Sequence, residues 1–499
     1  MKPLFLFVRP PRPLWPFNGP STAFWPPLAF ASLAAALRDS VPEMRVAILD
    51  APALAMGWNS LAQQLRQMQP DYVAIGEEAV SCVEGLRIAK LAKQLGARVI
   101  AGGCFFSHVA SQVLATGLID VVVHGEGERT IVELARALQS RDAKALRNVR
   151  GISFLEGEEV VFTGWRELIA DLDELPFPAY DLLPMKKYGG RSRNHERMAT
   201  IELGRGCSNG CEFCILWRQM GRLHDERPVP CLRVKSAERL LEEARILMDR
   251  FQRRYLAWVD PCFNADPQAA AQFADLMLKE DRRIGQSAWV RADHLLRDDA
   301  SGALGVCVES GWNEAYLGLE RLERSELGQL HKGNLHGEAE RALQTLDRKY
   351  PKVVTVGSFI YGFPWETPES VRWLFRRAKR LPLDVLFFIP LTPLPGTPYW
   401  RPEMWDPTGE RFRSFDFLPR VGLGGSLAEL SKEIVKGYLF CWPAERVRRT
   451  LRGLLARDGR RRRITRQILW RGAPLLLSGI LERSQGNRGG MLYPTWYES

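Results

Sequence analysis

Short apolar runs alternate with stretches of helical spacing over the first 140 residues, and this alternation narrows the folds open to the chain more than any other feature. Five runs rich in Val, Ile, Leu and aromatic residues occupy residues 4–8, 45–49, 72–76, 98–102 and 120–124. Helical spacing lies between them, at residues 28–37, 61–68, 83–95 and 109–116. Such alternation is typical of βαβ units, in which helices cover both faces of a parallel sheet. We therefore predict a flavodoxin-like, doubly wound α/β domain over residues 1–140.

A second alternation follows between residues 190 and 400. Its six β-like runs lie at residues 199–203, 255–259, 286–290, 315–319, 353–361 and 385–389. Ser236 precedes a stretch with one apolar face, so we expect it to cap a helix there. Six strands with intervening helices predict a partial (β/α)6 barrel over residues 190–400, with its chemistry at the carboxyl ends of the strands.

The segment between the two alternations, residues 141–189, differs from both. GISFLEGEEVVFTG is typical of a small hairpin with its turn around Gly157. DLDELPFPAYDLLP adds prolines and acids in quick succession, which favours extended and turning backbone over helix. We interpret residues 141–189 as a linker with a small hairpin, and residues 401–499 as a basic, mainly helical region.

Three cysteines on one short loop are the strongest chemical signal. Cys207, Cys211 and Cys214 follow the β-like run at residues 199–203, with three and two residues between successive sulfurs. Three thiolates can hold three irons of a cubane cluster and leave the fourth iron open to a small molecule. A zinc site completed by His224 is the alternative that the spacing leaves open.

Composition limits the class of protein. The chain has 499 residues, of which 46% are hydrophobic and 25% charged, as in ordinary globular proteins. Prolines at positions 10, 11, 13 and 16 interrupt the start, so no signal peptide is expected. No apolar run reaches the roughly 20 residues that cross a bilayer. Nine cysteines without a second cluster spacing argue against a disulfide framework, so we expect a cytoplasmic protein whose other cysteines are mostly small buried hydrophobes.

The residue before the third cysteine sharpens the interpretation of the loop. Phe213 makes the motif C-x3-C-x-F-C, directly after a β-like run. This pattern resembles the signature of the radical S-adenosylmethionine (SAM) enzymes. The resemblance implies a 4Fe-4S cluster on the three cysteines, whose open iron takes the amino and carboxylate groups of SAM. It also implies that Phe213 lies beside the adenine.

Segments after the later strands extend the resemblance. GLERLERSELGQLHKG is similar to the family's fourth strand end, FIYGFPWET to its glycine-rich fifth strand end, and LTPLPGTPYW to its closing strand and turn. Two departures, Pro261 where a second acid is common and Arg321 where serine is common, put the usual acidic contact to the SAM amino group in doubt. The resemblance suggests as SAM contacts Phe213, Asp260, Arg291, Glu320 and Gly362.

Glycines gather at the carboxyl ends of the strands in the first domain, where open sheets bind ligands. AGGCFFSHV followed by DVVVHGEGERT resembles the cobalamin-binding domain that precedes many radical SAM barrels. The usual D-x-H-x-x-G turn is absent, which implies base-off cobalamin without that histidine ligand. His108 and His124 are candidates by residue type, although a hydrogen-bonding role is favoured for each. The expected cobalamin contacts are Gly76, Gly102, Gly103, Gly125, Glu126, Gly127 and Glu128.

The combined resemblance covers roughly residues 4–400 and implies a cobalamin-dependent radical SAM enzyme. Its first expected activity is methyl transfer from methylcobalamin to an unactivated carbon, after a 5′-deoxyadenosyl radical derived from SAM has abstracted a hydrogen atom. Cyclisation or rearrangement with the same cofactors is one alternative, and a non-catalytic cobalamin or iron-sulfur binding protein is another. The expected partners are a small-molecule or natural-product substrate and an electron donor such as flavodoxin or ferredoxin, without nucleic acid. No protein group is assigned as a catalytic acid or base.

The formal net charge of +11 concentrates in the tail, where arginines interleave with leucines between residues 446 and 457. Such a basic amphipathic pattern fits contact with a membrane surface. Packing of these helices against the barrel is the alternative. Five tryptophans of this part of the chain either line a substrate pocket or fill cores: Trp400, Trp405, Trp442, Trp470 and Trp496.

Overall fold

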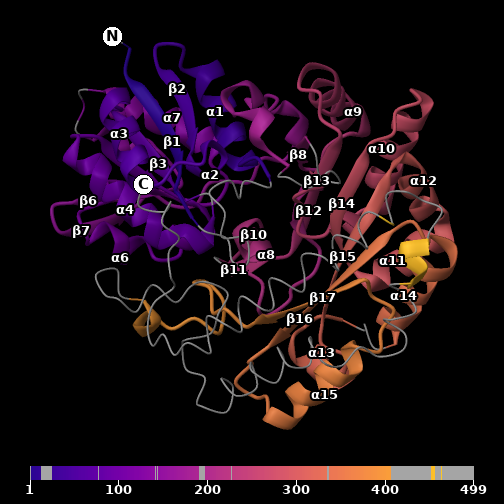
Figure 1. The fold of residues 1–499 in the computed structure, drawn as a ribbon. Helices are drawn as coiled ribbons and strands as arrows, with labels where there is room; N and C mark the ends of the chain where they lie inside the picture. Colours follow the sequence, from indigo (N-terminus) through magenta and orange to yellow (C-terminus); the bar gives the residue numbers. More distant parts are fainter. Residues whose placement is uncertain are drawn as a thin grey trace.

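The computed structural model describes residues 2–12, 25–76, 78–140, 142, 144–189, 197–225, 227–333, 337–405, 451–455 and 462. Two large sheets lie side by side, the first coloured indigo to purple and the second magenta to orange in Figure 1. Among the described residues, no helix combines the length and the apolar character that a membrane span requires.

The first sheet has the strand order β2-β1-β3-β4-β5-β6-β7. Its first five strands are parallel, and their order 2-1-3-4-5 is the flavodoxin-like order, so the predicted fold of this part is confirmed. These strands are β1 Leu4–Arg9, β2 Arg45–Asp50, β3 Tyr72–Ile75, β4 Arg98–Ala101 and β5 Val121–Val123. The predicted hairpin is confirmed as β6 Ile152–Glu156 and β7 Glu159–Phe162. It pairs antiparallel with β5 and extends the sheet, a pairing that the sequence did not indicate.

Helices cover both faces of the first sheet, because alternate residues of each strand point to opposite faces. Phe5 and Phe7 of β1 belong to one apolar core with α1 and α7, whereas Leu6 and Val8 belong to a second core with α3 and α4. The helices are α1 Leu28–Ser40, α2 Ala51–Leu54, α3 Trp58–Met68, α4 Cys82–Gln94, α5 Gly103–Phe106, α6 Ala110–Leu114 and α7 Glu128–Gln139.

The second sheet contains six parallel strands in the consecutive order β8-β13-β14-β15-β16-β17, which confirms the partial barrel. Its strands are β8 Met198–Ile201, β13 Tyr255–Trp258, β14 Gly285–Val290, β15 Trp312–Glu320, β16 Val354–Tyr361 and β17 Val385–Pro390. Its helices are α9 Ala237–Arg245, α10 Pro267–Lys279, α11 Ala292–Ser301, α12 Ala303–Ser310, α13 Arg324–Gln329, α14 Glu338–Lys349 and α15 Pro368–Ala378. Ser236 caps α9 as predicted, since its Oγ accepts the backbone N–H of Arg239 at 3.1 Å.

Two short antiparallel pairs carry the cysteine loop between β8 and α9. β9 Gly204–Cys207 pairs with β12 Cys231–Val234, and β10 Arg222–His224 pairs with β11 Arg227–Val229. The short helix α8 Leu216–Gln219 lies between β9 and β10 in sequence. These ladders are absent from the sequence-based prediction because strands of three and four residues carry little periodicity.

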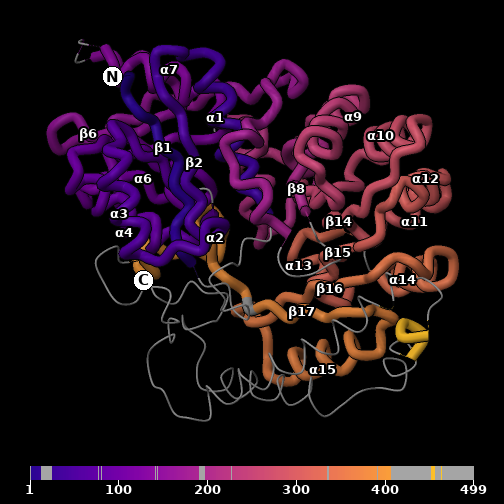
Figure 2. The backbone as a smooth tube through the Cα atoms, turned by 45° about the horizontal axis from the view of Figure 1, so that its top comes forward, coloured from indigo at the N-terminus to yellow at the C-terminus, as the bar shows by residue number. Residues whose placement is uncertain are grey.

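After β17 the chain returns to the first sheet, as the orange segment in Figure 2 shows. Trp400 and Trp405 pack edge-on against Phe105, with ring centroids 6.0 and 5.7 Å away. Trp405 therefore belongs to the second core of the first domain, and Trp400 packs against that core, as the core-filling alternative predicts. Residues 451–455 are helical, but most of the predicted basic tail, with Trp442, Trp470 and Trp496, lies outside the described residues.

Candidate functional site

The cysteine loop forms a tight turn after β9. Cys207 and Cys211 are 9% and 8% exposed, and Cys214 is partly buried. The carbonyl of Cys211 accepts the backbone N–H of Cys214 at 3.1 Å and the indole N–H of Trp217 at 2.8 Å. These two hydrogen bonds fix the turn that carries the three predicted ligands.

The three thiols differ in how readily they ionise, which matters because iron binds the thiolate. A hydrogen bond from the Cys262 thiol lowers the pKa of Cys207 to about 6, helped by Asn209 and Arg291. Burial raises the pKa of Cys211, although Lys332 and Arg291 oppose the rise. Burial also raises the pKa of Cys214 to about 11, against the backbone N–H groups of Leu216 and Trp217. The donors and positive charges around this loop therefore suit a group held by thiolates.

The zinc alternative finds no support in the geometry. His224 lies on β10 with its side chain 77% exposed, and its Nδ1 is 3.3 Å from Asp225. In the part of the chain that the structure describes, no three His, Cys, Asp or Glu side chains converge closely enough to hold a single ion. A cubane cluster places each thiolate on a different iron, so its cysteines need not converge on one point.

A buried acid and two buried bases lie next to the cysteine loop. Glu320 ends β15 at φ 61°, where the ladder to β16 is irregular, and its carboxylate accepts from Lys332 Nζ at 3.2 Å and Ser358 Oγ at 3.4 Å. Lys332 Nζ lies 5.6 Å from the ring centroid of Phe213. Arg291 donates to the carbonyl of Lys332 at 2.8 Å. The structure thus brings the predicted residues Phe213, Arg291 and Glu320 together.

Lys332 was missed by the sequence analysis. The only sequence feature that pointed to Lys332 was its place in GLERLERSELGQLHKG, the segment that is similar to the family's fourth strand end. Burial opposes the charge on Lys332, but the adjacent Glu320 raises its pKa above the usual value. Burial raises the pKa of Glu320 in turn, against the charge of Lys332. A zwitterionic ligand would find both signs of charge here.

The other two predicted SAM contacts make hydrogen bonds within the chain itself. Asp260 is 4% exposed, and its carboxylate accepts the N–H groups of Leu203 at 3.0 Å and Gly204 at 2.7 Å. Burial raises the pKa of Asp260 to about 7. Gly362 has φ 95° and donates its N–H to Glu366. Asp260 therefore anchors the start of the cysteine loop, and contact of either residue with SAM stays a prediction.

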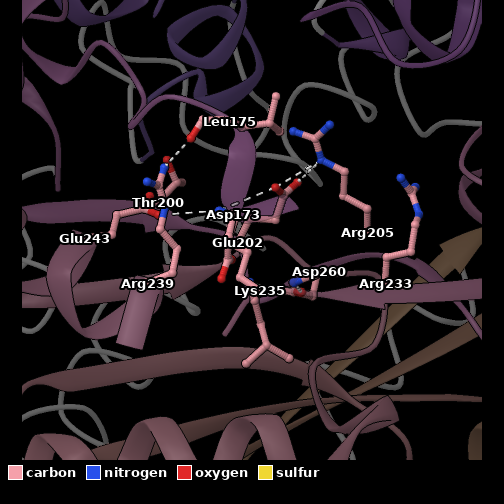
Figure 3. Close-up of polar contacts among 12 residues, drawn as sticks. Asp173, Leu175, Thr200, Glu202, Arg205, Arg233, Lys235, Arg239, Glu243 and Asp260 are labelled. Carbon is pink, nitrogen blue, oxygen red and sulfur yellow. Dashed lines mark hydrogen bonds and ion pairs between the residues drawn. The ribbon is translucent and has the colours of Figure 1, made fainter. Parts of the chain in front are cut away.

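A buried ion network connects the first sheet to the cysteine loop. Arg205, two residues before Cys207, pairs with Glu126 at 3.1 Å, Glu128 at 2.6 Å and Glu202 at 3.1 Å. Arg233 also pairs with Glu126, at 2.9 Å. Figure 3 shows the barrel side of this network, in which Glu202 lies between Arg205 and Lys235. Glu126 and Glu128 thus use their carboxylates to hold the barrel, and their contact with cobalamin stays a prediction.

The glycines at the strand ends allow close backbone contact. Gly76 and Gly103 have φ 106° and 76°, and a Cβ on either would collide with the backbone carbonyl of Gly102 or Gly76. A Cβ on Gly127 would press on Leu33, whereas Gly125 faces open space. At the same edge, Nε2 of His108 is buried without a hydrogen-bond partner in the described part of the chain. An open glycine and an orphaned ring nitrogen are compatible with a ligand at this edge.

This edge of the first sheet meets the cysteine loop directly. Ser107 Oγ donates to the side chain of Gln219 on α8 at 3.2 Å. Burial raises the pKa of Cys104 to about 11, and Cys214 lies near enough to raise it further. A side chain on Gly396 would collide with the ring of His108, so the returning segment closes the same space. The two predicted cofactor sites therefore share one region.

His124 holds the same edge from inside. Its Nε2 lies 2.8 Å from Ser153 Oγ, and burial together with His108 lowers its pKa to about 4.

The low pKa of His124 predicts a stability that depends on pH. Between pH about 6.5 and 4 the unfolded chain binds more protons at His124 than the folded chain does, so the contribution of His124 to the free energy of unfolding is lost as pH falls. We expect the unfolding free energies of wild type and His124→Gln to differ by about 2 to 3 kcal/mol more at pH about 7.5 than at about 4.5. Urea unfolding at both pH values measures this difference in the free energy of unfolding. A difference that does not change with pH would contradict the lowered pKa of His124.

Comparison with known proteins places these features in a family context. The sequence model of the B12 binding domain matches residues 17–135. An uncharacterized methyltransferase of Pyrococcus horikoshii is 30% identical over 378 residues, 75% of this chain and 78% of that protein. The anaerobic magnesium-protoporphyrin IX monomethyl ester cyclase of Cereibacter sphaeroides is 26% identical over 76% of this chain and 60% of the cyclase.

Solved structures give a matching fold. The radical SAM methyltransferase TsrM of Kitasatospora setae, determined with cobalamin and a 4Fe-4S cluster bound, has a TM-score of 0.61 at 19% identity. The likeness covers 80% of this chain and 74% of TsrM. At this identity it shows that the two chains share the arrangement of a doubly wound domain before a partial barrel.

Proposed function

Because the chain belongs to the cobalamin-dependent radical SAM enzymes, we propose that it transfers a methyl group from methylcobalamin to an unactivated carbon of a small-molecule substrate. The observation that carries this proposal is the direct contact between the glycine-rich edge of the first sheet and the cysteine loop. Methyl transfer to a carbon needs both cofactors to face one substrate, and a shared region allows that.

Each cofactor has candidate residues in this chain. Cys207, Cys211 and Cys214 would hold a 4Fe-4S cluster, and the strand ends around Gly102 and Gly125 would hold cobalamin. When bound, the cluster supplies an electron to SAM, and cobalamin supplies a transferable methyl group. The protein's own part is to position the reacting groups and to exclude water and oxygen.

The charged residues beside the loop suit the methionine part of SAM. Lys332 and Arg291 present positive charge to a carboxylate, and Glu320 presents negative charge to an ammonium group. Lys332 and Glu320 are each 6% exposed, so these interactions are little weakened by solvent. Phe213 lies next to Lys332, where its ring is available to the adenine.

Cyclisation is a second candidate, which the 26% identity to the magnesium-protoporphyrin cyclase favours. Both reactions begin with removal of a substrate hydrogen atom, so the geometry around the cysteine loop serves either. They differ in the fate of the methyl group: a cyclase leaves SAM-derived methyl out of its product.

A deuterium label on the SAM methyl group distinguishes the two. Anaerobically reconstituted protein is incubated with methylcobalamin, labelled SAM, dithionite or flavodoxin, and a small-molecule extract of the cells that carry the gene. We expect 5′-deoxyadenosine, S-adenosylhomocysteine and an extract compound that has gained the labelled methyl. A new product without the label, formed with 5′-deoxyadenosine alone, would favour the cyclase. Formation of neither nucleoside would contradict both reactions.

A further inference from the structure

The six-stranded sheet of the barrel has one face that the helices cover and one that they do not. The helices α10, α11, α12 and α14 lie along the outer side of this sheet (Figure 1) and share one apolar core with it. The residues on either side of Trp289 and Tyr316 in the sequence belong to that core: Ala288, Val290, Ala315 and Leu317. Because the side chains of a strand alternate between the two faces, Trp289 and Tyr316 point to the opposite face, which we call the inner face.

Large apolar side chains are exposed on the inner face. Trp289 of β14 and Tyr316 of β15 are cross-strand partners, and their ring centroids lie 5.3 Å apart. Trp289 is 40% exposed, although β14 is an interior strand of the sheet. Val259, directly after β13, is 44% exposed, and Phe387 of β17 is 46% exposed. Exposed apolar side chains that gather on one face are typical of a binding site, whereas scattered single ones are ordinary.

The inner face is continuous with the residues proposed to bind SAM. Phe387 lies opposite Ser358 of β16, whose Oγ donates to Glu320 at 3.4 Å. Arg291 follows Trp289 by two residues in extended backbone, so these two side chains leave the chain on the same face. A ligand that contacts Trp289 and Phe387 would therefore lie next to the charged residues beside the cysteine loop.

The inner face offers such a ligand little free charge. Arg291 is 6% exposed and pairs with Asp293 at 2.7 Å. Glu320 is 6% exposed and pairs with Lys332 at 3.2 Å. A charged or strongly polar compound placed on this face would lose water without gaining new partners, which costs free energy. An uncharged flat ring, in contrast, gains from contact with aromatic side chains.

We propose that the inner face, formed by Val259, Trp289, Tyr316 and Phe387, binds the substrate through a flat, uncharged and largely apolar ring system. This inference deepens the proposed function and rests on it, because it names the class of compound that would be methylated. Contact with these side chains would hold the ring beside the SAM site, where the reacting groups must be close together.

An uncharged fluorescent naphthalene, prodan, tests the inner face without turnover. It is titrated anaerobically into protein reconstituted with cluster, cobalamin and SAM, and the blue shift of its emission measures binding. The test variants are Trp289→Ala and Phe387→Ala. Trp165→Ala is the matched control, because Trp165 is 42% exposed but follows β7 at the edge of the first sheet.

We expect wild type and Trp165→Ala to bind prodan equally. Trp289→Ala and Phe387→Ala should bind it about tenfold more weakly, since each loses one aromatic contact. In the labelled-methyl assay, the labelled compound should come from the ethyl acetate fraction of the extract. The same two variants should need about tenfold more of that fraction for half-maximal labelling. Should an alanine variant fail to fold, Trp289→Leu or Phe387→Leu replaces it.

Several results would overturn the proposal. Equal binding of prodan by wild type, Trp289→Ala and Phe387→Ala would show that the inner face is not its site. No binding by wild type would mean that another part of the chain covers this face. A labelled compound found only in the water phase would contradict the apolar class and leave the methyl transfer standing. If prodan binds as expected but neither nucleoside forms, the proposed function and the substrate role fall together, and only a site for apolar rings remains.

Discussion

Replacing Cys211 by alanine is expected to abolish cluster binding and formation of 5′-deoxyadenosine. Cys211 is only 8% exposed, and its carbonyl organises the turn by accepting hydrogen bonds from Cys214 and Trp217. Two remaining thiolates cannot hold three irons. The loss should exceed the roughly 100-fold that is typical when an outer hydrogen-bond partner of a metal ligand is removed. Iron and sulfide content and nucleoside yield measure the effect.

The control for this variant is Cys307→Ala, which removes a buried thiol from the barrel core and should keep both cluster and nucleoside yield. Equal yields in the Cys211 and Cys307 variants would show that the loop is not a cluster site. Zinc bound by wild-type protein in place of iron would lead to the same conclusion.

Arg205→Met is expected to destabilise the protein by about 3 to 5 kcal/mol, because it leaves buried carboxylates without their partner. Arg205, Glu126 and Glu128 have side chains only 9%, 9% and 7% exposed, and Arg205 pairs with both acids. Urea unfolding followed by tryptophan fluorescence measures the change. Since the network connects the two sheets, the lost stability should come mainly from weaker packing of one sheet region against the other.

An exposed ion pair provides the comparison for Arg205. Arg147 and Glu156 pair at the surface with side chains 51% and 46% exposed. Arg147→Met should change the free energy of unfolding far less than Arg205→Met does, since solvent screens such pairs. If both variants lowered the free energy of unfolding by the same amount, the buried network would not be what holds the sheets together.

Much of the fold could be predicted because its strands carry strong local patterns. The five parallel strands of the first sheet and the six of the barrel each read as a short run of β-branched and aromatic residues between helical stretches. In the barrel the order of the strands then follows from the rule that βαβ connections join neighbouring parallel strands, whereas in the first sheet the chain crosses from β2 past β1 to β3. The helix cap at Ser236 could also be predicted, because a capping hydrogen bond involves only residues of the first helical turn.

Apart from the short β-ladders around the cysteine loop, the missed features depend on contacts between distant parts of the chain. The hairpin of β6 and β7 was predicted, but its pairing with β5 depends on which edge of the first sheet is free. Likewise, Cys262 meets Cys207 and Lys332 meets Glu320 only when strand ends gather at one edge of the barrel. No periodicity in the sequence predicts such contacts between side chains.

The same reasoning applies to residues whose role differs from the simplest expectation. Glycines at strand ends suggested a ligand close to the backbone, but Gly76 and Gly103 are already needed to let two loops pass each other. Acids beside those glycines suggested ligand contacts, but Glu126 meets arginines about 80 to 110 positions later in the chain. Glycines and acids at a strand end therefore indicate close contacts there, but they do not show whether the contact is with a ligand or with another part of the chain.

The packing of Trp400 and Trp405 against Phe105 has a consequence for how the protein is made. On the ribosome, the first sheet is complete about 240 residues before these tryptophans are synthesised. At about 5 to 20 residues per second, the aromatic surface around Phe105 waits roughly 12 to 48 seconds for its cover. We therefore expect the nascent chain to expose apolar surface during that interval, and expression of the amino-terminal half alone to leave that surface uncovered.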